Sequence, residues 1–134
     1  MGNISRNLEG KLMDAMFHNE SYAGGDAIWV ALFITTPDDD EPGTEPGDTY
    51  ARRQITPTSK AEVAGKTQIT NENALEFPVS TESWGTITHI GIFNHETSTA
   101  VDNYMWWGAL EEARTIDANM LLKFFPNELK INLD

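Results

Sequence analysis

The segment Ser83–Phe93 limits the possible folds most, because its composition suits a β-strand that buries both of its faces. It contains three isoleucines, two threonines and two aromatic residues in eleven positions, all of them residue types enriched in strands. In an extended chain one face carries Ile87, His89, Gly91 and Phe93, and the other carries Thr86, Thr88, Ile90 and Ile92. We therefore expect a central strand with an apolar layer on each side.

Several further strands are indicated by alternation of apolar and polar residues, or by short apolar runs between turn residues. They cover residues 27–34, 50–56, 66–69, 74–79, 104–110, 120–125 and 129–133, with 66–69 as a short edge strand. Two of them alternate clearly, so their apolar side chains are expected to face inward: Leu75, Phe77 and Val79 in the first, and Leu129, Ile131 and Leu133 in the second.

The first residues show a different period, that of an amphipathic helix from Asn3 to about His18. Apolar side chains recur three and four residues apart, at Ile4, Leu8, Leu12, Ala15 and Met16. Asn3 or Ser5 can cap the start of this helix. The helix either closes one end of a sheet or docks as an arm on a neighbouring protein, and the sequence leaves both possibilities open.

These patterns predict a mainly β, single-domain protein: an antiparallel β-sandwich or flattened barrel with one N-terminal α-helix. We expect residues 1–20 to form the helix or arm and residues 21–134 the β-domain. A chain of 134 residues buries about two thirds of the surface that its unfolded form exposes. It needs no covalent staple for stability, and the absence of cysteine excludes disulfides and zinc–thiolate sites.

The net charge of −12 would repel a phosphate backbone, so nucleic acid is not expected as a partner. A membrane is not expected either, because the longest uncharged apolar run, Ala27–Ile34, is too short to cross a bilayer. Arg6, Glu9 and Lys11 occupy the place where a secretion signal would have its apolar core.

Six carboxylates gather between Asp38 and Asp48, in a segment with two Pro-Gly pairs and no large apolar side chain. This composition predicts a solvated surface loop. As a calcium loop of the EF-hand type it is defective, because Pro42 stands at the fifth position and Thr49 stands where a bidentate glutamate is needed. Of the two arginines that follow, Arg52 and Arg53, at most one can pair with this loop, in an exposed or rim ion pair.

Candidate catalytic chemistry is absent from the sequence. The three histidines, His18, His89 and His95, have neither the helical nor the strand spacing of a metal pair. No nucleophile elbow, phosphate-binding loop or dinucleotide fingerprint occurs. We therefore expect no enzymatic activity, no catalytic residue, no cofactor and no metal.

Interface residues are the remaining candidates. Trp106 and Trp107 face opposite ways in a strand, so one can fill the core while the other is aimed at the opposite surface or lies under a covering loop. Together with the helix stripe they form the predicted interface: Ile4, Leu8, Leu12, Met16, Trp106 and Trp107.

Blocks along nearly the whole chain resemble a family of small virion proteins of tailed phages, described as head-fibre, decoration or tail-fibre proteins. The resembling blocks are residues 3–12 (NISRNLEGKL), 28–37 (IWVALFITTP), 50–52 (YAR), 75–78 (LEFP), 83–93 (SWGTITHIGIF), 107–110 (WGAL) and 129–134 (LKINLD). The acidic loop from Asp38 to Asp48 and the tail of the turn from Asn94 to Asn103 depart from the family in length and charge. The resemblance implies no enzymatic activity and no cofactor.

Two functions follow as hypotheses from this resemblance. In the first, the protein is a capsid decoration or cement protein, a homo-oligomer expected to be a trimer, which binds the major capsid protein on the outer capsid surface after synthesis in the host cytoplasm. In the second, it is a tail-tip or fibre module that binds a host surface or other tail proteins.

Overall fold

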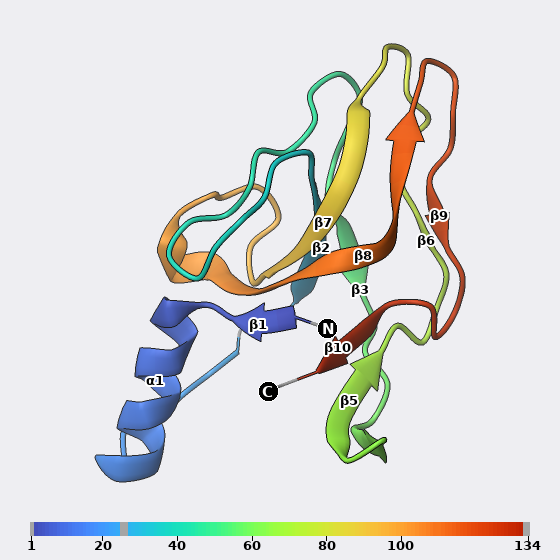
Figure 1. The fold of residues 1–134 in the computed structure, drawn as a ribbon. Coiled ribbons are helices and arrows are strands. Elements are labelled where there is room, and N and C mark those ends of the chain that lie inside the picture. The colour runs from blue at the N-terminus through green and yellow to red at the C-terminus, as the bar shows by residue number, and fades with distance from the viewer. Residues whose placement is uncertain (1, 25–26, 133–134) are drawn as a thin grey trace.

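The computed structural model describes residues 2–24 and 27–132, which form antiparallel β-sheets and one N-terminal helix (Figure 1). This confirms the predicted mainly β fold, and the sheets do not close into a barrel. The elements are β1 (Gly2–Ile4), α1 (Arg6–Phe17), β2 (Ile28–Phe33), β3 (Arg53–Ile55), β4 (Ala61–Val63), β5 (Lys66–Thr70), β6 (Leu75–Glu76), β7 (Gly85–Phe93), the 3-10 turn η1 (Val101–Asn103), β8 (Tyr104–Ile116), β9 (Lys123–Phe124) and β10 (Lys130–Asn132).

The main sheet has five strands in the order β1-β8-β7-β2-β3. Its middle strand is β7, which pairs with β2 on one side and with β8 on the other. The prediction of a central strand at this segment is therefore confirmed. A three-stranded sheet, β10-β5-β4, and the pair β6-β9 complete the β-structure.

One face of the main sheet carries the larger core, in which Val30, Leu32, Ile90, Ile92 and Trp106 meet side chains from β6, β9 and their flanks. These side chains are Leu75 of β6 and Phe124 of β9, with Phe77, Leu122 and Leu129 from the flanking segments. Two layers thus enclose the core, as a sandwich requires.

Ile87 belongs to this same core and is fully buried, although strict alternation placed it with His89 on the other face. The reason is a β-bulge: Ile87 pairs with Arg114 while His89 pairs with Ala109, so residues 110–113 stand opposite Thr88 alone. A bulge reverses the facing of the residues beyond it, which corrects the predicted faces of β7.

The opposite face of the main sheet carries a smaller cluster of Ala31, Phe33, Phe93 and Tyr104, with Trp107 packed against it. The rings of Phe33 and Phe93 meet edge to face at 6.3 Å. Gly91 makes this packing possible, since a Cβ there would lie 2.4 Å from Phe33 Cζ.

The smaller strands correct several predicted bounds. The segment at β5 is the middle strand of its sheet rather than an edge, because β4, which the sequence analysis missed, pairs with it through a tight hairpin at Ala64 and Gly65. Leu75 and Phe77 are buried as expected, but Val79 is 53% exposed. Leu129 is buried and Ile131 packs against the core, while the predicted inward position of Leu133 lies outside the described residues.

The helix is shorter than its apolar period indicated. Residues 2–4 form strand β1, which pairs with residues 106–108 of β8, and α1 starts only at Arg6. Gly2 fits there because a Cβ would fall 2.0 Å from the Trp106 ring. Asn19, with a φ of 55°, follows the C-cap residue His18, in the left-handed conformation common just after a helix.

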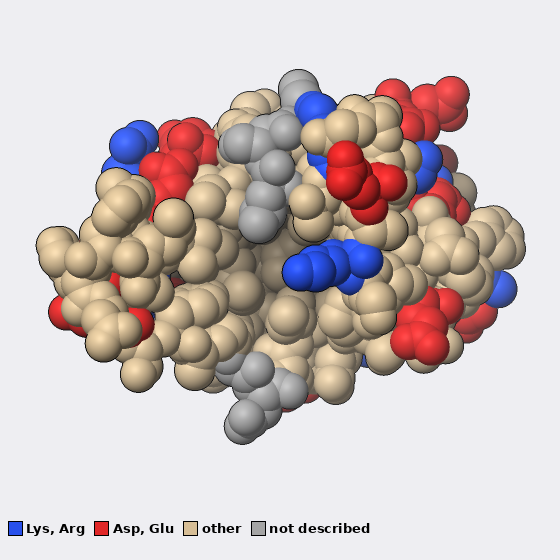
Figure 2. Space-filling view, turned by 90° about the horizontal axis from the view of Figure 1, so that it is seen from below, with Lys and Arg blue, Asp and Glu red and all other residues tan. Residues whose placement is uncertain are grey.

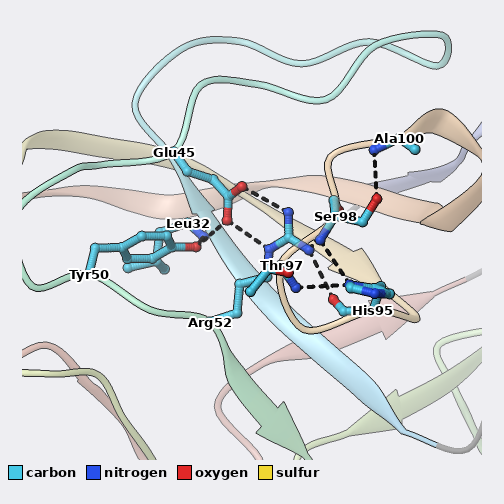
Figure 3. A network of polar contacts seen from close by, with 8 residues as sticks. All are labelled: Leu32, Glu45, Tyr50, Arg52, His95, Thr97, Ser98 and Ala100. Carbon is cyan, nitrogen blue, oxygen red and sulfur yellow. Dashed lines mark hydrogen bonds and ion pairs between the residues drawn. The ribbon is translucent and has the colours of Figure 1, made fainter.

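The acidic loop is tied to the protein by a buried ion pair rather than left in solvent (Figure 3). The side chains of Arg52 and Glu45 are 2% and 15% exposed. Arg52 also donates through Nη1 to the carbonyls of His95 and Ser98, at 2.9 Å each. The loop lies at the surface as predicted, with Asp38, Asp40 and Asp48 exposed. The expectation of an exposed or rim ion pair is wrong, because an arginine fork can neutralise a carboxylate that the fold encloses.

A second carboxylate of the loop, Asp48, fixes the turn before β7. It accepts hydrogen bonds from the backbone N–H groups of Thr81 and Glu82, the Thr81 hydroxyl and Trp84 Nε1. These donors, with the Thr81 hydroxyl first, hold the pKa of Asp48 well below its usual range.

Candidate interaction surface

The N-terminal half of α1 is held firmly against the main sheet and two loops. Ser5 caps the helix by accepting from the Leu8 N–H at 3.2 Å, and its hydroxyl donates to the Tyr104 carbonyl at 2.5 Å. Arg6 Nε donates to Asp40 at 2.6 Å, and Asn7 donates to the Val101 carbonyl at 3.0 Å. The helix is thus anchored at one end by polar contacts from three separate segments.

The C-terminal half of α1 presents apolar side chains to solvent. Met13, Met16 and Phe17 are 56%, 71% and 67% exposed, and we refer to these three residues as the helix tip. The polar contact described within this half joins His18 Nδ1 and Asp14 Oδ1 at 3.1 Å. Three large apolar side chains together on one element are unusual on a monomer surface and indicate a contact site.

An apolar groove of about 300 Å³ lies beside the helix. One wall comes from β1, α1 and the segment after it, the floor from the main sheet, and the other wall from β5 and β10. The described residues that line the groove are Ile4, Leu8, Leu12, Tyr22, Ile28, Ile55, Pro57, Thr67, Ile69, Ile92, Met105, Trp106 and Ile131, and none of these is charged. Burial raises the pKa of Tyr22, whose ring lies on this wall.

In Figure 1, α1 and the β4-β5 hairpin lie below the main sheet, one on each side. Figure 2 shows the molecule from below, and so from this end. The face is hollowed near its middle. Among the described residues that Figure 2 colours, uncharged ones border the hollow, with a basic group beside it. On a chain with a net charge of −12, such a surface offers an apolar contact with little electrostatic repulsion.

The structure brings four of the six predicted interface residues together, since Ile4, Leu8, Leu12 and Trp106 all line the groove. Met16 lies beyond them, exposed on the helix tip. Leu8 and Trp106 are themselves buried, so they form the base of the groove rather than its rim. Whether this surface binds a partner stays a prediction.

Trp107 is the residue that the structure separates from this group. It lies on the opposite face of the main sheet, packed against the smaller cluster, and is half-buried. Its Nε1 donates to Asp39 of the acidic loop at 2.9 Å. The ring therefore lies under a covering loop, and its indole N–H is satisfied there.

The helix tip also contains two residues that sequence reasoning missed. Met13 and Phe17 lie off the stripe of period 3.6 that runs from Leu8 to Met16. The predicted interface took its helix residues from that stripe alone, so the apolar residues beside the stripe were left without a role. The apolar arc of the predicted helix is wider than one packing stripe, and this width could have identified both residues from the sequence.

Other kinds of site find little support in the part of the chain that the structure describes. Within residues 2–24 and 27–132, no three His, Asp or Glu side chains converge to hold a metal ion. The acidic loop's carboxylates point to different partners, with Asp39 on Trp107, Asp40 on Arg6 and Glu45 on Arg52. No helix among these residues is long and apolar enough to span a bilayer.

His89, the histidine at the centre of the sheet, has a local role. Its Nδ1 lies 2.8 Å from the Thr88 hydroxyl, and its ring lies 6.1 Å from that of Trp107. Burial lowers the pKa of His89, which favours the neutral ring. The described contacts of the His89 ring are thus with its chain neighbour Thr88 and with the ring of Trp107.

Comparison with known proteins was informative at the level of the family. A family model described as Podophage GP4 fiber I protein gp80 matches residues 3–132 of the chain. No curated protein matches the chain.

Proposed function

Because the chain belongs to the podophage GP4 fiber I protein gp80 family, and is thus a structural protein of the phage virion, we propose that it is a subunit of a fibre attached to the particle. On this proposal it acts by binding other proteins and performs no chemistry. Its partners are proteins, and neither nucleic acid nor membrane, since its net charge of −12 would be repelled by phosphate groups.

The observation that carries this proposal is the presence of two apolar features on α1, the exposed helix tip and the groove lined by Leu8 and Leu12. Full burial of a Met or Phe side chain stabilises a contact by about 1.5–3 kcal/mol. The helix tip alone would contribute on the order of 5 kcal/mol, part of which is offset by the entropy lost on association. A surface of this kind suits an attachment that forms once, during assembly.

Capsid decoration, the first hypothesis from the sequence, is the second candidate. The net charge favours it, because a strongly acidic subunit suits an outer shell surface that faces water rather than packaged DNA. In that case the groove and helix tip would contact the major capsid protein. The family description supports the fibre more directly.

Copy number on purified particles separates the two candidates. Quantitative mass spectrometry against a tail protein of known stoichiometry gives the number of chains per virion. A fibre predicts copy numbers on the order of the tail's symmetry, about a dozen or a few dozen, whereas a shell protein predicts hundreds. Labelling with an antibody fragment and electron microscopy would then place the chain on the tail or on the shell.

The role of the surface is tested by supplying variants during phage growth. The double change Met16→Ser and Phe17→Ser removes apolar area that is already exposed, so folding is expected to be unaffected. We expect fewer copies in the purified particle. The matched control is Phe125→Ser, which removes a side chain of similar exposure, 61%, from a site near β9. Equal incorporation of both variants would contradict the proposed attachment surface.

A further inference from the structure

A second cavity, of about 360 Å³, lies between the second half of β8 and the segment from β9 to β10. It is distinct from the apolar groove, because Lys130 and Asn132 of β10 line the cavity whereas Ile131 between them lines the groove. Neighbouring residues of a strand face opposite ways, so β10 stands between the two spaces. The cavity is large enough for a small ligand, since such pockets measure about 300–1,000 Å³.

The bulge in β8 forms one wall of the cavity. Leu110, Glu111 and Glu112 belong to the bulged segment that stands opposite Thr88, and all three line the cavity. Both glutamates are exposed, and neither has a hydrogen bond or ion pair to another described residue. Bulges are frequent beside functional sites because they re-aim side chains. Here the bulge brings two unpaired carboxylates to the cavity.

Arg114, the first residue after the bulge, lines the cavity and is held in place by its neighbours. Its Nη1 donates to the Lys123 carbonyl at 3.2 Å, and its Nη2 donates to Glu128. The guanidinium carbon lies 4.8 Å from the centre of the Phe124 ring. The two hydrogen bonds use two of the five N–H groups of an arginine. The side chain therefore keeps donors for a ligand while Glu128 neutralises its charge.

Strand β10 supplies the other polar lining. Lys130 is exposed and has no hydrogen bond or ion pair to another described residue. Asn132 is fixed by its backbone carbonyl, which accepts from Trp106 Nε1 at 3.0 Å. Its side-chain oxygen is buried and has no hydrogen-bond partner within residues 2–24 and 27–132. Buried polar atoms are nearly always hydrogen-bonded, so this acceptor indicates a donor that the described chain does not provide.

The mixture of charges in the lining limits the kind of ligand. An anion would approach Glu111 and Glu112, and a cation would approach Lys130 and Arg114, so neither sign is favoured throughout the cavity. A metal ion has no site here, because no three His, Asp or Glu side chains converge among the described residues. A hydroxyl group both donates and accepts hydrogen bonds, and it therefore suits a lining that offers acceptors and donors together.

We propose that the cavity binds a neutral saccharide ring. The hydroxyl groups of the ring donate to the carboxylates and the amide oxygen described above and accept from the two cationic side chains. The carbon–hydrogen face of the ring packs on the apolar lining, which Leu110, Phe124 and Leu129 provide. A ring of about twelve heavy atoms, held by a few such contacts, binds with a dissociation constant on the order of 1 mM.

The inference goes beyond the proposed function and does not rest on it. The helix tip, which carries the proposed attachment, contributes none of the described residues that line the cavity. A chain that attaches to the particle through the helix tip can therefore bind a saccharide or fail to bind one, and the two experiments have separate outcomes.

The test is titration of the purified, 15N-labelled full chain with glucose, galactose, N-acetylglucosamine and rhamnose, followed through the amide chemical shifts. Glycerol serves as a control for weak binding of any polyol. The variants Glu112→Ala and Lys130→Ala each remove one polar group from an exposed position, so folding is expected to be unaffected. The matched controls Glu96→Ala and Lys60→Ala remove the same groups from exposed positions outside the cavity lining.

We expect at least one of the sugars to shift the amides of residues 109–114 and 128–132. Each cavity variant should weaken that binding about five- to tenfold, as the loss of one hydrogen bond predicts, and neither control should change it. Shifts that are absent, that glycerol reproduces at the same concentration, or that neither cavity variant reduces would overturn the inference. Tighter binding of free lysine or of inorganic phosphate than of every sugar would also overturn it, because the cavity would then select one charge.

Discussion

Arg52 and Glu45 form a two-pronged ion pair, with Nε to Oε1 and Nη2 to Oε2 both at 2.8 Å. The Tyr50 hydroxyl donates to Glu45 at 2.6 Å, and the guanidinium lies 3.8 Å above the Phe93 ring. The pair thereby joins the acidic loop to the turn after β7 across the smaller apolar cluster. It ties the acidic loop to the connection between β7 and β8, which also accepts a hydrogen bond from Asn7 of α1 at the Val101 carbonyl.

Replacing Arg52 with Ala should lower the free energy of unfolding by about 3–5 kcal/mol, because it leaves Glu45 enclosed without its cation. Urea unfolding at neutral pH measures the change. Arg53→Ala is the control, since Arg53 donates to the Glu76 carbonyl from a more exposed position and should contribute only about 1 kcal/mol. A smaller loss for Arg52 than for Arg53 would mean that the ion pair does not stabilise the fold.

Acid should destabilise the protein partly through Asp48. Its pKa is lowered in the folded state, chiefly by the Thr81 hydroxyl. Its contribution is therefore full above the unfolded pKa of about 3.9 and is lost as pH falls through the folded pKa. Asp48→Asn removes this linkage, so its free energy of unfolding, measured by urea titration from pH 6 downward, should fall less steeply than that of the wild type. Parallel curves would exclude the role.

Gly91→Ala should destabilise the protein by about 1–3 kcal/mol, because the added methyl group overpacks the Phe33 ring. The midpoint of thermal unfolding reports the loss. Gly47 has open space where its Cβ would lie, so Gly47→Ala should leave the midpoint nearly unchanged. Similar midpoints for the two variants would show that the cluster has room to adjust.

Ser5→Ala should lower the free energy of unfolding by about 0.5–2 kcal/mol through loss of the helix cap. Gly10, at mid-helix with open space around it, provides the opposite test, because Gly10→Ala should stabilise the helix by about 0.5–1 kcal/mol. Far-ultraviolet circular dichroism during urea unfolding follows both. Changes of the same sign would mean that the helix does not limit stability.

The centre of the fold could be read from the sequence because its strands are rich in apolar residues. The runs at β2, β7 and the first half of β8 are composed for burial on both faces, and all three lie in the middle of the main sheet. The second half of β8, with the sequence EEART, carries no such signal. It is a strand because Thr86 and Ile87 pair with Thr115 and Arg114 across the sheet, a tertiary cause that overrides local propensity.

At the N-terminus, the sequence pattern predicted a helix where the structure has a strand. Ile4 fits the helical stripe, but its backbone pairs with Trp106 as part of β1, and periodicity alone does not reveal a strand partner a hundred residues away. The same limit explains Arg52. Its burial depends on Glu45, Phe93 and the His95–Ser98 turn meeting around it, whereas residue counts indicated only an acidic loop.

For the candidate surface, the sequence supplied Leu8, Leu12 and Met16 through their spacing, and Trp106 through its aromatic character. Thr67, Ile69 and Ile131 complete the groove from β5 and β10. Their contribution could not be predicted, because it depends on how the small sheet stands beside the helix.

The two ends of the described chain meet at Trp106. Gly2 lies against the Trp106 ring, and Trp106 Nε1 donates to the Asn132 carbonyl at 3.0 Å. Figure 1 shows the first and last described strands, β1 and β10, close to each other. Any affinity tag or fluorescent protein fused to either end would therefore stand beside the groove and compete with whatever binds there. A reporter inserted in the turn between β4 and β5 would stand at the groove's other wall, so the exposed turn around Asn119, beyond β8, is the better place for labels.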